Sequence, residues 1–138
     1  LGSGVIWGSV SDRLGRRQAL AIVFLVQMVA LVLFALGINR LAFAASATLY
    51  GLAGWSVPAI MAAAVGDYVD ERVVPAGIGL TVLIFGIGQV LGPGIAGAIA
   101  DAAGSFSPAF GLAAVVALLG AIGSLALRRP DRNASAGQ

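Results

Sequence analysis

The sequence has no cysteine, no histidine and no lysine, and only 10% of its 138 residues are charged. Without cysteine there is neither a disulfide framework nor a thiol nucleophile, and the usual ligands of zinc sites are missing. We therefore expect no metal and no cofactor, and the composition argues against a soluble hydrolase. The net charge of +2 comes from arginines scattered through apolar sequence rather than gathered on one polar face, so we expect no nucleic-acid partner.

What the chain has in abundance is long apolar runs. Four uncharged stretches of 22, 26, 28 and 26 residues lie between successive charged positions, at 18–39, 41–66, 73–100 and 102–127. About 20 apolar residues are enough for a helix to cross the hydrocarbon layer, and the backbone of a span must form its own hydrogen bonds. The sequence predicts an all-α, polytopic transmembrane bundle with full spans near 19–38, 42–65, 75–100 and 106–127, and the end of a fifth span at 1–10.

The placement of arginine predicts the orientation of these spans. Basic residues accumulate in short cytoplasmic loops. If residues 11–18 are cytoplasmic, alternation places 66–74 and the tail at 128–138 on the same side, which then holds seven of the eight arginines, while Arg40 is alone on the other. We expect a protein of the bacterial inner membrane, surrounded by the lipid bilayer, with its C-terminal tail in the cytoplasm.

Charge is concentrated in one stretch, GSVSDRLGRR at 8–17. Its glycines and charges, Gly8, Asp12, Arg13, Gly15, Arg16 and Arg17, resemble the cytoplasmic loop signature of the major facilitator superfamily, G-x-x-x-D-[RK]-x-G-[RK]-[RK], at every defining position. The resemblance implies a membrane transporter, not an enzyme, that moves a small solute by alternating access. It also implies that Asp12 makes a contact only when the cytoplasmic side is closed.

A simpler interpretation of the same stretch is a basic loop that only fixes orientation. In either interpretation we expect Gly15 to supply a turn and Arg16 and Arg17 to face the anionic inner leaflet. The complete match to the signature, followed by four spans, favours the transporter.

A second pattern lies in the span at 75–100. Six positions fit the superfamily's antiporter motif, g-x8-G-x3-G-P-x2-G-G, with only Ala96 departing from it: Gly79, Gly88, Gly92, Pro93, Ala96 and Gly97. Small residues four apart allow two membrane helices to approach closely, and a proline permits a kink. Static packing is the favoured interpretation; a hinge between transport states is the alternative.

Two halves of the superfamily fold are compatible with these motifs. The loop signature follows the second helix and, in weaker form, the eighth. The span at 42–65 lacks the arginine that first-half sequences commonly carry, and the polar residues 128–138 are typical of a disordered terminus. These features favour the second half, whereas the antiporter motif belongs to the fifth helix and favours the first. The stretches GDYVDERVVPAGIGL and FGIGQVLGPGIAGAIAD resemble the bacterial YbfB/YjiJ-like branch.

Few polar residues occur inside the spans. A buried amide in lipid must find a partner or face water, and aromatic residues at mid-span lie away from the membrane interface. We therefore predict Gln27, Tyr50, Trp55 and Gln89 as candidate cavity-lining residues; a hydrogen bond between helices is the alternative for the two amides. No span carries a titratable carboxylate, so a coupling carboxylate is expected in the N-terminal half, which this chain would require as its partner.

Two competing functions stay open at this point. One is a truncated membrane fragment that only packs, because residues 1–10 resemble the end of a helix whose beginning lies upstream. The other is a small four-helix multidrug exporter acting as a dimer. That exporter relies on a glutamate embedded in its first helix, and no span here has one.

Overall fold

The computed structural model describes residues 14–54 and 56–127. These residues form five helices and no strand: α2 (Arg16–Leu36), α3 (Arg40–Gly54), α4 (Ser56–Tyr68), α5 (Val74–Ala103) and α6 (Ser107–Ala126). The expected all-α class is confirmed for this part of the chain. The predicted end of a fifth span at 1–10 and the tail at 128–138 lie outside the described residues.

Four helical segments are long and apolar enough to cross a membrane: α2, the segment Arg40–Tyr68 that contains α3 and α4, α5, and α6. At 1.5 Å per residue, the 21 residues of α2 extend about 31 Å, which matches the hydrocarbon thickness. Large apolar side chains point outward throughout, with Leu41 80% and Val90 79% exposed. Lipid is the surrounding that stabilises such a surface, and the prediction of a polytopic transmembrane bundle is confirmed.

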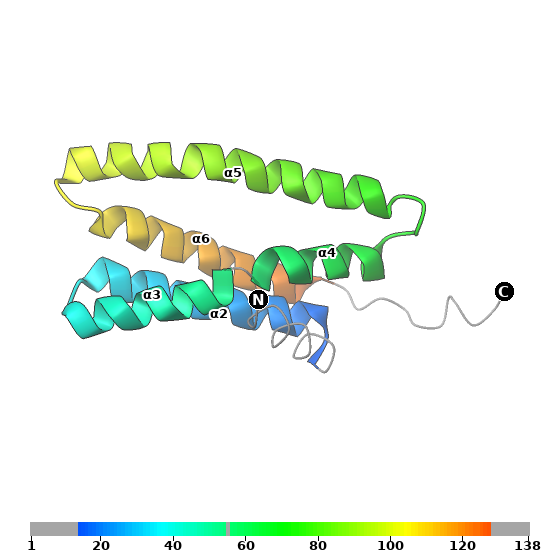
Figure 1. Ribbon diagram of the computed structural model, residues 1–138, viewed down its shortest axis with the longest axis horizontal. Coiled ribbons are helices and arrows are strands. Elements are labelled where there is room, and N and C mark those ends of the chain that lie inside the picture. Colours follow the sequence, from blue (N-terminus) through cyan, green and yellow to red (C-terminus); the bar gives the residue numbers. More distant parts are fainter. Residues whose placement is uncertain (1–13, 55, 128–138) are drawn as a thin grey trace.

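Short, well-formed turns bring successive segments back antiparallel (Figure 1). Gly37 ends α2 in the left-handed conformation with φ 55°, and its N–H donates to the carbonyl of Leu33. Two residues later, the Asn39 side chain accepts a hydrogen bond from the Ala42 N–H at 2.8 Å and caps the start of α3. Gly104, with φ 70°, ends α5 in the same left-handed way.

Helix α2 lies at the centre of the bundle and contacts α3, α4 and, most extensively, α6. The contact with α6 is close because α6 presents a row of buried small residues, Ala114, Ala117, Ala121 and Ser124. A Cβ added at Gly120 would lie 3.1 Å from the ring of Phe24 on α2. Small residues spaced three and four apart are the means by which membrane helices approach each other.

An aromatic cluster joins α2, α3 and α6 at the end of the bundle where α2 meets α3. Phe34 meets Phe43 edge-on, with ring centroids 4.8 Å apart, and stacks on Phe110 at 5.2 Å. The Ser107 hydroxyl also donates to the carbonyl of Ala35 at 2.7 Å. We call this the aromatic end; it fixes three helices by packing and one hydrogen bond.

Helix α5 is the least packed element. It contacts only α4 and α6 to any extent, and none of its most apolar stretch is buried within the chain. Its closest approach to α4 is at Gly77, where a Cβ would lie 2.7 Å from Cγ1 of Val65. Glycine at this position is therefore what permits the contact.

We predict that Gly77→Ala destabilises the protein by about 1–3 kcal/mol, because Val65 is β-branched and cannot easily turn its methyl group away. The matched control is Gly86→Ala on the same helix, where an added Cβ meets nothing within 4 Å. That variant should be neutral, or stabilising by up to about 1 kcal/mol. Thermal unfolding of the purified protein in detergent measures both, and Val65→Ala should restore the stability of Gly77→Ala. Equal stabilities of the two glycine variants would contradict the close contact.

Candidate functional site

Arg16 and Arg17 of the loop signature lie at the end of the bundle opposite the aromatic end, where α2 begins and α4 and α6 terminate (Figure 1). Gly15 precedes α2 with φ 92°, a conformation that residues with a side chain rarely adopt, so this glycine makes the turn that leads into the helix. We call this region, formed by residues 14–17, 67–73 and 127, the charged end. Gly8, Asp12 and Arg13 of the signature lie outside the described residues.

Arg16 joins the signature to the end of α4. Its Nε donates to Oδ2 of Asp67 at 2.8 Å, across 51 residues of sequence. The arginine side chain is 23% exposed and the carboxylate 47%, so water reaches the pair. An ion pair with this exposure contributes less than about 1 kcal/mol, which makes it a contact that can open and close at little cost.

Arg17 joins the signature to the end of α6. Its guanidinium donates to the backbone carbonyl of Leu127 at 3.3 Å, across 110 residues. The last carbonyls of a helix have no partner within the helix and carry partial negative charge, so a cation is stabilising there. Two adjacent arginines in the first turn of α2 thus contact the ends of two other helices.

The turn between α4 and α5 completes the charged end. Asp70 accepts a hydrogen bond from the Arg72 backbone N–H at 3.0 Å, and the Val73 N–H donates to the Asp70 carbonyl at 2.9 Å. Together with Glu71, the turn puts acidic and basic groups side by side in exposed positions. No group of three residues able to hold a metal ion occurs in residues 14–54 and 56–127.

The small residues of α5 that fit the antiporter motif are largely open, including the face of Gly88, Gly92 and Ala96. A Cβ added at Gly79, Gly88, Gly92 or Gly97 would meet nothing within 4 Å, and Ala96 is half-buried. Helix α5 continues without interruption past Pro93. The predicted close packing of this face has no counterpart among the described helices, and it stays a prediction about a helix from elsewhere.

The four candidate cavity-lining residues are dispersed. Gln27 is half-buried and shares one side of α2 with the buried residues Val23 and Ala30, Tyr50 on α3 is 44% exposed, and Gln89 on α5 is exposed. Trp55 lies outside the described residues. Lining of a common cavity by these residues stays a prediction.

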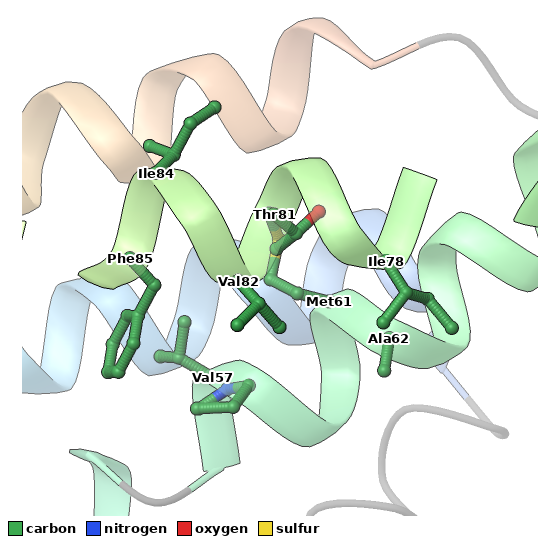
Figure 2. Close-up of a pocket in the computed structure, with 9 residues that line it drawn as sticks. Val57, Met61, Ala62, Ile78, Thr81, Val82, Ile84 and Phe85 are labelled. Carbon is green, nitrogen blue, oxygen red and sulfur yellow. The ribbon is translucent and has the colours of Figure 1, made fainter. Parts of the chain in front are cut away.

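A cavity lies between α4 and α5; it has a volume of about 260 Å³ and is walled mainly by apolar side chains (Figure 2). Sequence reasoning missed it, because a hollow depends on how far two helices diverge and not on any motif. It also missed Asp67 as the partner of Arg16. The only available signal was that both charges stand at the boundary of a predicted span.

We predict that Asp67→Asn and Arg16→Gln each lower stability slightly and that their double-mutant coupling energy is below about 1 kcal/mol. Because the pair is water-exposed, the coupling should decrease between low salt and about 1 M salt as the Debye length shrinks. Unfolding of the unmodified protein, the two single variants and the double variant in detergent measures the coupling energy. The control is Asp101→Asn, because Asp101 lies near the C-terminal end of α5, away from the charged end. Coupling between Arg16 and Asp101 as large as that between Arg16 and Asp67 would show that the effect is not local.

We also predict that Gly92→Leu impairs folding or transport more than Gly94→Leu. The two positions lie about 200° apart on a helix, and only Gly92 shares a face with Gly88 and Ala96. Membrane insertion and expression of the two variants, compared in the full natural protein, measure the difference. If both are tolerated equally, the face is not a helix contact.

Comparison with known proteins places these features in a family. A search of curated proteins and a search of solved structures found no match. The sequence model of the Major Facilitator Superfamily matches residues 1–138, the whole chain. With a transmembrane helix bundle, a loop signature whose arginines hold helix ends, and this match over its full length, the chain belongs to the major facilitator superfamily of membrane transporters.

Proposed function

We propose that the chain is the C-terminal half of a bacterial inner-membrane secondary transporter of the YbfB/YjiJ-like branch, which moves a small solute by alternating access. In this proposal the charged end is the cytoplasmic gate. The observation that carries it is the pairing of Arg16 with Asp67 at 2.8 Å, together with the contact of Arg17 with Leu127. The loop signature therefore acts on two helix ends at once.

The energetics suit a gate. Alternating access requires two states that differ by only a few kcal/mol, so that both are populated during each cycle. A contact worth about 1.4 kcal/mol changes the ratio of the two states tenfold. The exposed Arg16–Asp67 ion pair lies below this value, so it biases the equilibrium without locking one state. Asp12 would add a contact made only in the closed state.

The aromatic end supports the same proposal from the opposite side. There, α2, α3 and α6 are held by packed phenylalanine rings and by the hydrogen bond that the Ser107 hydroxyl donates, contacts that involve no charged group. The three helices have the contacts of a rigid unit, whereas α5 has an open face. In our proposal this face meets the N-terminal half, and the two halves rock against each other.

No acidic or basic residue lies within the apolar stretches of the described helices; their charges stand at helix ends. A group that couples transport to protons must change its charge inside the membrane, so it would belong to the N-terminal half. The alternative of a four-helix multidrug exporter lacks support, because the single glutamate of the sequence, Glu71, stands in the turn between α4 and α5.

We predict that the charged end faces the cytoplasm. A fluorescent-protein reporter fused at Gln138 should be active in the cytoplasm, and a phosphatase reporter fused after Arg40 should be active on the opposite side. Fusions within the turn at 69–73 are the matched control and should behave like the fusion at Gln138. A phosphatase that is active at Gln138 would contradict the orientation and the assignment of the gate.

A further inference from the structure

The hollow between α4 and α5 arises from the way these two helices diverge. They touch where Gly77 faces Val65, close to the turn that joins them. Farther from this contact, α4 and α5 separate and leave the cavity of about 260 Å³. Figure 2 shows Ile78 and Val82 of α5 directed toward α4, with Phe85 beside Val57.

The walls of the cavity differ from the rest of the α5 face. Ile78, Val82 and Phe85 are large, and across from them Met61 of α4 has a flexible thioether side chain that adapts to the shape of a partner. The following turns of α5 carry the small residues Gly88 and Gly92 on the same side. A flat row of small residues suits a closely packed helix, whereas a hollow with large, adaptable walls suits a small guest molecule.

The chemistry of the lining defines the guest. Among the described residues of the lining, Thr81 has the only polar side chain, and its hydroxyl already donates to the carbonyl of Gly77 at 2.9 Å. This leaves the oxygen lone pairs as the single side-chain hydrogen-bonding function of these residues. None of them is charged, and an ion would lose its hydration there without compensation. The guest is therefore uncharged and mainly apolar, with room for one donor group near Thr81.

The volume sets the size of the guest. A dry cavity of roughly 150 Å³ accommodates one benzene molecule. At about 260 Å³, the α4–α5 cavity has room for a two-ring aromatic group or an alkyl chain of similar volume.

We propose that the α4–α5 cavity is a binding site for an uncharged apolar group of this size. The group belongs either to a free solute or to the acyl chain of a membrane lipid. The first source rests on the proposed transport function, whereas binding itself does not.

Photolabelling with benzophenone, a neutral two-ring ketone, tests the site. The excited ketone takes a hydrogen atom from a neighbouring C–H bond, and the two radicals combine, so the label stays at the contacted residue. The sequence has two methionines: Met61 lines the cavity, and Met28 on α2 does not. With the full natural protein in detergent micelles, we expect saturable labelling at Met61, and at Met28 only the unsaturable labelling that follows the benzophenone content of the micelle.

Two variants of α4 sharpen the test. Ala62→Phe places a ring into the cavity and should reduce labelling of Met61 at least fivefold, whereas Ala59→Phe, also exposed but outside the lining, should leave it unchanged. Thermal unfolding of both variants shows whether they are folded. Unsaturable labelling at Met61, or labelling that survives Ala62→Phe in a folded protein, would overturn the proposal.

Competition separates the two sources. Biphenyl that displaces benzophenone from Met61 at constant lipid content indicates a free aromatic solute. Displacement by added phosphatidylcholine, without an effect of biphenyl, indicates a lipid acyl chain. The labelling experiment does not require transport. A negative labelling result would therefore contradict the binding site but not the proposed transport function, and a negative transport assay would not change the labelling result.

Discussion

Exclusion of charge from the membrane-spanning stretches is the constraint on which the rest of the structure depends. Because no water reaches the hydrocarbon layer, backbone groups must be satisfied within their own helix, and polar side chains need a partner in the protein. Hydroxyls in the spans do this by donating to the carbonyl four residues earlier, as Ser46, Ser56, Thr81 and Ser124 do. These hydroxyls therefore do not link helices to one another. The helices are held together by close packing of small residues and by contacts at their two ends.

The two ends hold the bundle by different means. At the aromatic end, Phe34 lies between rings of α3 and α6, and this packing is insensitive to water. At the charged end, Arg16 and Arg17 reach the ends of α4 and α6 through exposed polar contacts. In the mechanism that we propose, the charged end opens while the packing at the aromatic end is kept.

Much of the fold follows from the spacing of charge. Uncharged stretches of 22 to 28 residues predicted four membrane-spanning segments, and the bounding charges that the structure describes stand near helix ends. The observed helix ends differ slightly from the predicted ones. The span predicted at 75–100 leaves Asp101 in a loop, but α5 continues to Ala103, because nothing breaks the helix before Gly104. Gly15 was expected to make a turn from its place in the signature, and its φ of 92° is that of a turn glycine.

Contacts between distant segments could not be predicted in this way. Arg16 was expected to face lipid headgroups, but its partner Asp67 becomes visible only when α2 and α4 are placed side by side. The contact of Arg17 is with a backbone carbonyl, which every residue has, so no side-chain pattern marks it. The α4–α5 cavity likewise depends on one glycine, Gly77, that sets where the two helices touch.

Accessibility of a single cysteine on α5 tests alternating access most directly. The chain has no native cysteine, so Gln89→Cys would be its only thiol. The control is Leu83→Cys: Leu83 lies about 120° around the helix from Gln89 and is 60% exposed, so this thiol should face lipid. We expect an impermeant thiol reagent to reach Gln89→Cys from either side of the membrane, and Asp12→Asn to raise the cytoplasmic rate up to about tenfold while lowering the other. Reaction from one side only, unchanged by Asp12→Asn, would contradict a gate at the charged end.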